Sequence, residues 1–258
     1  MTARMQRCQR MGIMFLVVAI GCGGKQEAIS APEPQTTAPP ATTASHGTAA
    51  ITGTATLKGP PSAPQTIQMQ ADPVCHQQHT SPVRTDDVVV ANGRLANVFV
   101  YVKEGLANYP LTPPTTPVVL DQKGCLYAPH VTGVQVNQPL EIRNSDATLH
   151  NINAKPQGNQ PFNIAQPVQG MKTTKKFMKP EVMIPLKCNV HPWMSGYVGV
   201  VAHPFFAVTD TQGNFQLTGL PAGTYVLEAW HERFGTTAQT VTLGDGATHT
   251  LELSFQAK

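Results

Sequence analysis

The sequence has little charge and few aromatic side chains: 13% of its 258 residues are charged and 6% are aromatic. The formal net charge is +3, but three of the basic residues, Arg4, Arg7 and Arg10, lie at the extreme N-terminus. The remainder carries 15 basic and 15 acidic residues, so it lacks the excess of positive charge that binds nucleic-acid phosphates. We therefore exclude nucleic acid as a partner class.

The sequence also lacks the patterns of long helices and of nucleotide-binding loops. It contains 23 prolines and 21 glycines, a density typical of short strands joined by turns. There is no Walker loop, dinucleotide fingerprint or long-period repeat. The length and the 41% hydrophobic content suffice for a substantial core in one large or two small domains. A small scaffold held by disulfides alone is therefore excluded.

A basic segment followed by a short apolar run opens the chain. The apolar run spans residues 11–20 and is followed by Gly21. The basic segment, the apolar run and the small residue after it are typical of the n-region, h-region and cleavage site of a secretory signal. It is shorter than the roughly 20 apolar residues of a membrane-spanning helix, so a single transmembrane anchor is the less favoured alternative. Residues 23–50, rich in Pro, Thr and Ala, are expected to form a flexible tether.

The sequence that ends at Cys22 resembles the lipid-attachment site of bacterial lipoproteins, whose cysteine becomes the lipidated first residue of the mature chain. The resemblance implies that residues 1–22 are a signal peptide with a lipobox. It also implies an exported protein that a lipid anchor holds at the periplasmic face of a bacterial membrane.

Three cysteines, Cys75, Cys125 and Cys188, remain in the part of the chain that would be exported. An unpaired thiol in an oxidising compartment needs a reason, and metal binding by Cys188 is one. Cys75 and Cys125 are then expected to form a disulfide. The alternative is a second metal site, for which five clustered residues could supply ligands: Cys75, His76, His79, Cys125 and His130.

Short apolar stretches with the period of strands fill most of the chain. They comprise residues 51–57, 97–103, 134–143, 181–188 and 196–201, and then 206–209, 215–217, 224–230, 239–243 and 248–255. Gly, Pro and Asn mark turns between them. Residues 156–180 show no period, carry four lysines and are expected to form a solvated loop. The pattern predicts an all-β fold.

Four side chains of metal-ligand type occur in a compact pattern. Cys188, His191 and Met194 fall within seven positions between two predicted strands, and His150 ends another. Two histidines and a cysteine in a trigonal arrangement, with a weak axial methionine, are the ligands of a type 1 (blue) copper electron-transfer site. The thiolate gives the electron a path into the protein, the imidazoles suit both Cu(I) and Cu(II), and the thioether tunes the potential. We therefore predict one copper ion, of type 1.

Residues 118–202 resemble the cupredoxin family. The resemblance extends to the strand pair 134–144, to the step from His150 to Asn151, and to the Cys-x-x-His-Pro-aromatic-Met loop, which is most similar to that of amicyanins. It implies a Greek-key β-sandwich in which the two histidines bind copper through their δ nitrogens. It also implies that Asn151 steadies the thiolate.

The same resemblance implies a route for electrons. The downstream histidine, His191, would protrude through an apolar surface patch and serve as the electron port. Pro192 and Trp193 would form part of that patch.

The C-terminal segment, residues 203–258, resembles the carboxypeptidase regulatory-like domain, a transthyretin-type sandwich, through residues 209–217 and 220–225. The resemblance implies a second, smaller antiparallel β-sandwich. The N-terminal β segment 51–117 contains strands similar to the first strands of such a sandwich. We therefore expect residues 118–202 to be a cupredoxin domain that is inserted into, or packed tightly on, the sandwich that these two segments form.

The ligand set and the tether together predict a membrane-tethered periplasmic one-electron carrier whose partner is an exported redox enzyme or cytochrome. The alternative is a copper-binding protein for storage, sensing or delivery without redox turnover. Copper enzymes such as multicopper oxidases and nitrite reductases need further histidine clusters and a second cupredoxin unit, and the sequence contains neither. We therefore expect no enzymatic activity.

Overall fold

The computed structural model describes residues 47–106, 109 and 112–257. The predicted signal peptide, its lipid-attachment residue Cys22 and most of the predicted tether lie outside these residues. Among the residues described, no helix has the length and hydropathy needed to cross a bilayer. This part of the chain consists of strands and one short helix, which confirms the predicted all-β class.

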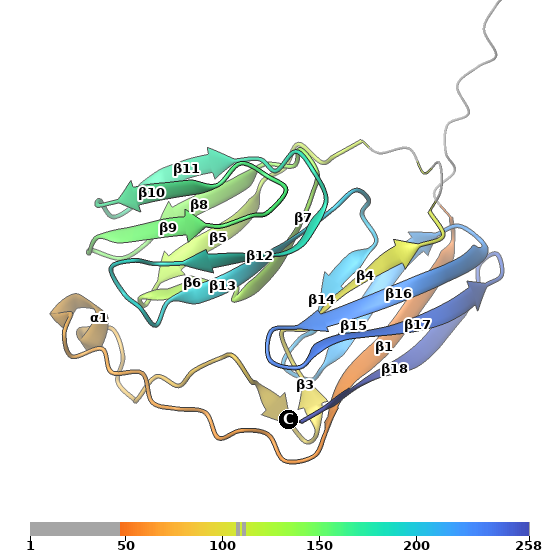
Figure 1. Cartoon of the computed structure of the whole chain (residues 1–258), viewed down its shortest axis with the longest axis horizontal. Helices are drawn as coiled ribbons and strands as arrows, with labels where there is room; N and C mark the ends of the chain where they lie inside the picture. The colour runs from red at the N-terminus through yellow and green to blue at the C-terminus, as the bar shows by residue number, and fades with distance from the viewer. Residues whose placement is uncertain (1–46, 107–108, 110–111, 258) are drawn as a thin grey trace, which may run out of the picture. The chain divides into compact units, whose positions relative to one another are not determined.

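The strands form two sandwiches, each made of two sheets (Figure 1). We call the one formed by residues 118–201 the central sandwich. Its first sheet has the order β10-β9-β12-β13-β7, with β7 (Val131–Gln135), β9 (His150–Ala154), β10 (Phe162–Gln166), β12 (Glu181–Lys187) and β13 (Ser195–Val201). Its second sheet has the order β11-β8-β5-β6, with β5 (Val118–Lys123), β6 (Leu126–Ala128), β8 (Leu140–Asn144) and β11 (Lys172–Lys175).

Two strand pairs of the central sandwich are parallel, β13 with β7 and β5 with β8. A parallel pair needs a crossover connection, so the chain passes repeatedly from one sheet to the other, as the predicted Greek-key sandwich requires. Residues 156–180, expected to be a loop, contain β10 and β11. Both lie at sheet edges. β10 alternates only through Phe162 and Ile164, which pack against the core, and β11 contains no apolar residue.

The second sandwich, which we call the flanking sandwich, is built from the chain on both sides of the central one. One sheet has the order β15-β1-β3-β2, with β18 paired to β1: β1 (Ala49–Lys58), β2 (Val90–Ala91), β3 (Arg94–Leu95), β15 (Asn214–Leu220) and β18 (Thr248–Gln256). The other has the order β14-β4-β16-β17: β4 (Phe99–Glu104), β14 (Phe206–Val208), β16 (Gly223–His231) and β17 (Gly235–Leu243).

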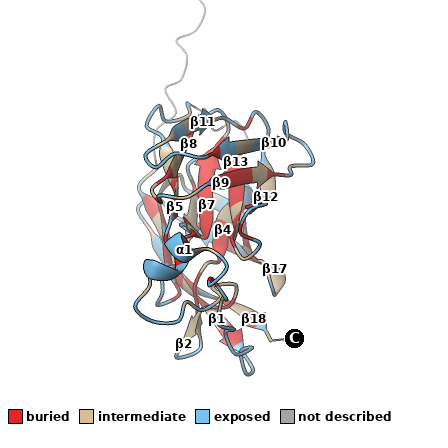
Figure 2. Cartoon of the chain, turned by 90° about the vertical axis from the view of Figure 1, so that its left-hand side faces the viewer, coloured by how far each residue is buried: buried red, intermediate tan, exposed pale blue. Residues whose placement is uncertain are grey.

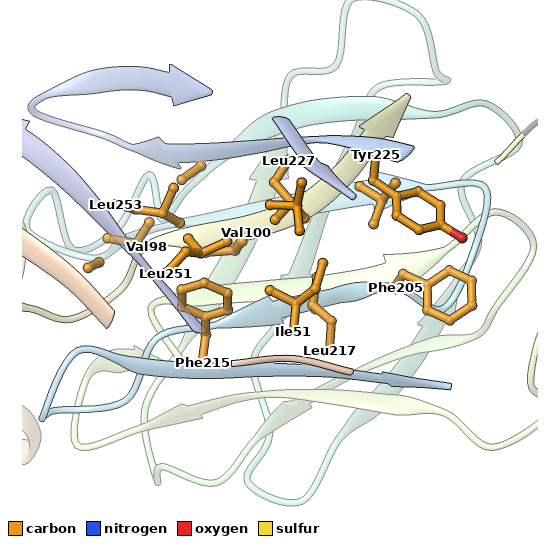
Figure 3. Close-up of a cluster of buried hydrophobic side chains, with 14 of the residues drawn as sticks. Ile51, Val98, Val100, Phe205, Phe215, Leu217, Tyr225, Leu227, Leu251 and Leu253 are labelled. Atoms are coloured by element: carbon orange, nitrogen blue, oxygen red, sulfur yellow. The ribbon is translucent and has the colours of Figure 1, made fainter. Parts of the chain in front are cut away.

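The flanking sandwich differs from its expected form in two respects. In the described part of the chain its sheets have five and four strands, as do those of the central sandwich, because β1 to β4 join the C-terminal strands. It is also not wholly antiparallel, since β1 and β18 pair in parallel over residues 50–58 and 248–256. Its core is apolar and lies between the two sheets, where Ile51, Phe215 and Leu227 are among the side chains in contact (Figure 3).

Two glycines allow the sandwiches to pack closely against each other. A Cβ atom on Gly133 of β7 would lie 2.3 Å from the ring of Phe206, and one on Gly199 of β13 would lie 2.5 Å from the ring of Phe99. The two rings stack with their centroids 5.7 Å apart. A side chain at either glycine would therefore force the two sandwiches apart.

The chain between β1 and β2 leaves the flanking sandwich and reaches the central one. We call residues 66–84 the cap segment; it contains the helix α1 (Pro73–Gln77), whose N-cap is Asp72. Met69 and Cys75 of this segment are buried in the core of the central sandwich. The helix lies at one end of that sandwich (Figure 1), and its outer surface is exposed (Figure 2).

Candidate metal centre

The loop between β12 and β13 carries three of the predicted ligands. Cys188 follows the last residue of β12, and Met194 precedes the first residue of β13. The Cys188 N–H donates to the carbonyl of Met194 at 3.1 Å, and the Met194 N–H donates to the carbonyl of His191 at 2.9 Å. These bonds close a tight loop between two antiparallel neighbours. All three side chains are buried.

The fourth predicted ligand, His150, begins β9, which pairs with β12. Its Nδ1 atom lies 3.0 Å from Nδ1 of His191, and Sγ of Cys188 lies 3.9 Å from that same His191 nitrogen. In protein sites, nitrogen ligands lie about 2.0 Å and thiolate sulfur about 2.3 Å from the metal, so ligand atoms of one ion are at most about 4.3 Å apart. Both separations satisfy this limit, and the three side chains fit one shared metal ion.

Cys188 is the free cysteine among the described residues, and its side chain is buried. The His191 N–H donates to Sγ at 3.4 Å. Burial would raise the pKa of the thiol, but hydrogen bonds with His150 and with backbone N–H groups of the loop outweigh burial and lower the pKa to about 6. The thiolate is the form of cysteine that binds metals, so the site favours the ligand form.

The other ring nitrogen of each histidine meets a carboxylate. Nε2 of His150 lies 2.8 Å from Oδ2 of Asp146, and Nε2 of His191 lies 2.9 Å from Oδ2 of Asp72. When Nε2 donates its proton to a carboxylate, the Nδ1 lone pair is left for a metal. Burial would lower the pKa of His150, but its hydrogen bonds with Asp146 and Cys188 raise the pKa to about 9. A metal that binds at Nδ1 would therefore displace a proton from this ring.

Asp146 is itself fixed by the loop between β5 and β6. Its two carboxylate oxygens accept hydrogen bonds from the N–H groups of Gly124 and Cys125, each at 2.8 Å. Burial would raise the pKa of Asp146, but the hydrogen bond with His150 and these two backbone bonds lower it below the ordinary aspartate value. The carboxylate is therefore ionised and held in one orientation.

Asn151, the predicted neighbour of the thiolate, joins β9 to the ligand loop. Its Oδ1 atom accepts a hydrogen bond from the Asn189 N–H at 2.6 Å and lies 3.4 Å from Sγ of Cys188. The hydroxyl of Tyr127 donates to the Asn151 carbonyl at 2.7 Å, which fixes the backbone at this step.

His191 does not protrude from the surface as the sequence resemblance implied. The residue is only 2% exposed, because the cap segment lies over it, with Asp72 at Nε2 and Sγ of Cys75 3.5 Å from the same nitrogen. Pro192 is exposed, and Trp193 is half-buried and donates through its indole N–H to a backbone carbonyl at 3.0 Å. The predicted port therefore lies beneath a cover.

Cys75 and Cys125 form the expected disulfide. The disulfide leaves neither thiolate for the alternative second metal site. Among the other residues of that alternative, Nε2 of His79 lies 2.8 Å from a backbone carbonyl, and His130 interacts with Glu232 of the flanking sandwich.

Neither carboxylate of the site was predicted from the sequence. Asp146 lies only four residues before His150, but it precedes the strand and shares no periodic pattern with it. Asp72 is separated from His191 by 119 positions. Its one local signal is the step from Asp72 to Pro73, which marks a helix N-cap and gives no indication of a metal site.

Comparison with known proteins gives one family match. The model of the carboxypeptidase regulatory-like domain matches residues 199–256, which include the C-terminal strands of the flanking sandwich. No curated protein matches the sequence.

Several solved structures resemble part of the chain. A Cu-containing nitrite reductase from Thermus scotoductus SA-01 is 25% identical over 33% of this chain and 22% of its own, with a TM-score of 0.31. A purple cupredoxin from Nitrosopumilus maritimus is 20% identical over 33% of this chain and 97% of its own, with a TM-score of 0.28. A reduced amicyanin variant is 18% identical over 40% and 98%, with a TM-score of 0.30.

Proposed function

We propose that this chain is a type 1 copper protein that carries single electrons, with one copper ion held by His150, Cys188, His191 and Met194. The observation that carries the proposal is the convergence of two imidazole nitrogens and one thiol sulfur at separations that suit a single ion. A bound copper ion supplies the one-electron couple between Cu(I) and Cu(II).

The surroundings of the ligands suit electron transfer. The side chains of His150, Cys188 and His191 are at most 4% exposed, so water has little access to the ligands. They are attached to strands and to a loop closed by its own hydrogen bonds, which limits their movement when the charge of the site changes by one. Small reorganisation makes transfer fast.

Met194 is proposed as the weak axial ligand. It is 1% exposed and lies in the same apolar core as Cys188. A thioether ligand adds no charge to the site and tunes the potential.

The proposed route for electrons runs through Trp193. The rings of Trp193 and His191 lie with their centroids 5.0 Å apart, and Trp193 is partly exposed beside the exposed Pro192. We propose an exported redox enzyme or a cytochrome as the partner that docks there, and electron carriage rather than enzymatic turnover as the activity.

The proposed location is the periplasmic face of a bacterial membrane, with a lipid on Cys22. Replacing Cys22→Ser in the full chain is expected to move the protein from the membrane fraction to the soluble fraction of cells. If the variant stays with membranes, the lipid anchor is wrong.

The direct test of the copper proposal is spectroscopic. The full chain, loaded with Cu(II), should show an intense visible thiolate-to-copper band and a narrow copper hyperfine splitting, both lost reversibly on reduction. Cys188→Ser should abolish the band and keep the strand content seen by circular dichroism. The control His249→Gln alters an exposed histidine of the flanking sandwich and should leave the band unchanged.

A different spectrum would contradict the type 1 copper proposal. A weak band with a tetragonal spectrum in the unaltered protein would mean that the ligands do not close as a trigonal set. Storage, sensing or delivery of copper would then replace electron carriage.

A further inference from the structure

We propose that Asp72 of the cap segment is a positioning residue of the metal centre: it fixes the ring of His191 with Nδ1 directed at the other ligands, and the disulfide Cys75–Cys125 holds it in place. The inference deepens the proposed function and rests on the same site.

Both oxygens of the Asp72 carboxylate accept hydrogen bonds. Oδ1 accepts hydrogen bonds from the N–H groups of Val74 and Cys75, at 2.9 and 3.2 Å. Oδ2 accepts one from the Thr148 hydroxyl at 3.0 Å and one from Nε2 of His191 at 2.9 Å. The carboxylate is therefore held in position from the helix and from the segment that precedes β9.

This bond selects a tautomer of His191. With the proton on Nε2 donated to Asp72, Nδ1 keeps its lone pair and faces Nδ1 of His150 at 3.0 Å and Sγ of Cys188 at 3.9 Å. Without Asp72, the ring could rotate or place its proton on Nδ1, and either change would remove a metal ligand.

Each of the two histidines is held by one carboxylate, and the disulfide links the two segments that hold these carboxylates. The N–H of Cys125 donates to Asp146, which holds His150, and the N–H of Cys75 donates to Asp72, which holds His191. Each half of the disulfide thus anchors the carboxylate that orients one ligand. The disulfide therefore attaches the cap segment to the central sandwich and also limits the distance between Asp72 and Asp146.

The test separates positioning from helix capping. Asp72→Ser keeps an N-cap side chain, which is among the residues preferred at that position, but a serine is too short to reach His191 as well. Loss of a residue that orients a metal ligand typically weakens metal binding about 10- to 100-fold. We therefore expect Asp72→Ser in the full chain to weaken Cu(I) binding by that factor, measured by competition with a chromogenic chelator.

A second readout requires no metal. In the metal-free protein, nitrogen-15 NMR should find the His191 proton on Nε2, protected from exchange, and Asp72→Ser should abolish that protection. The more conservative variant, Asp72→Asn, keeps an oxygen acceptor and should lose less affinity than Asp72→Ser. The control Asp245→Ser changes an exposed aspartate of the flanking sandwich and should behave as the unaltered protein.

The outcomes distinguish this inference from the proposed function. If Asp72→Ser binds Cu(I) as tightly as the unaltered protein and keeps the His191 signal, the positioning role is wrong even where the protein is blue. If the unaltered protein gives no intense thiolate band, but Asp72→Ser still loses affinity and Nε2 protection, the electron-carrier proposal fails and the positioning role stands.

Discussion

The two sandwiches differ in what they bury. The flanking core is apolar, and among the described residues of that sandwich the buried polar side chains are Thr209 and His231. The described part of the central sandwich buries many more, namely Gln122, His130, Thr132, Gln135, Gln138, Asn144, Asp146, His150, Asn151, Gln166 and His191. Both cores have similar strand counts in the described chain, so fold size does not explain the contrast.

This difference indicates that the core of the flanking sandwich serves stability, whereas the core of the central sandwich also contains the candidate metal centre. A buried polar group is destabilising unless it is hydrogen-bonded, so a core made for stability alone would avoid such groups. In the central sandwich, Asp146 is hydrogen-bonded to the candidate ligand His150, and Asn151 contacts the candidate ligand Cys188. The flanking sandwich is thus the simpler scaffold, and the central sandwich carries the site.

Removing the disulfide should have the largest effect on stability, and that effect should fall on the central sandwich. Cys75 and Cys125 are 50 positions apart, and cross-linking a loop of that length contributes about 4 kcal/mol to stability. The double variant Cys75→Ala, Cys125→Ala should lower the free energy of unfolding by about this amount. Urea unfolding followed by tryptophan fluorescence would measure it. An unchanged midpoint would show that the cap segment stays in place without its crosslink.

A core truncation in the flanking sandwich should affect stability and leave the site alone. Leu227 is fully buried in the apolar core, so Leu227→Ala should lower the free energy of unfolding by about 3 kcal/mol. The visible copper band should not change. Thr240→Ala, at an exposed position of β17, is the control. A shifted band in Leu227→Ala would show that the core of the flanking sandwich affects the metal centre.

His130 joins the two sandwiches and gives stability a pH dependence. Its ring contacts Glu232 through Nε2 and lies 3.3 Å from Asp86 through Nδ1. Burial would lower the pKa of His130, but the hydrogen bond with Glu232 and the charge of Asp86 raise it above the ordinary value of 6.5. A raised pKa means that protonated His130 stabilises the fold fully below that ordinary value, and that the contribution is lost as the pH rises through the folded-state pKa.

The variant His130→Gln should therefore be destabilised by about 2 kcal/mol in acid, the size of a hydrogen bond to a charged group. At about pH 5.5 the difference from the unaltered protein should be largest, and at about pH 9 it should be much smaller. Chemical unfolding at the two pH values checks this. A difference that does not decrease between the two pH values would contradict this pH dependence.

The smallest effect on stability should come from the proposed axial ligand. Met194→Leu conserves volume in a buried position and should lower the free energy of unfolding by less than about 1.5 kcal/mol. The reduction potential should nevertheless rise, because the weak axial donor is removed. Met178→Leu, at a position 67% exposed, should leave the potential unchanged in the same voltammetric measurement. An equal potential in both variants would place Met194 outside the ligand set.

The sequence could reveal those parts of the fold and site that are encoded locally. The alternation in β1 and the tight spacing from Cys188 to Met194 each lie within one strand or loop, where the pattern is short enough to read. The all-β class follows from such patterns, and the odd number of cysteines favours the disulfide while leaving the second metal site open.

The remainder depends on contacts between distant segments. The support of His191 by Asp72, and the cover that hides its ring, arise from a segment that leaves one sandwich and packs on the other. The edge strands β10 and β11 escaped prediction for a different reason. β11 contains no apolar residue, and the alternation of β10 is limited to Phe162 and Ile164, which is too short to stand out among the surrounding polar residues.

The inserted arrangement has a consequence for protein engineering. Residues 118–201 form one uninterrupted stretch, so a designer could excise them as a ready-made domain. That fragment would contain His150, Cys188 and His191, but it would lack Asp72 and Cys75, which lie earlier in the chain. The boundary of the module in the gene and the boundary of the site in space do not coincide, and a successful transplant would have to carry the cap segment with it.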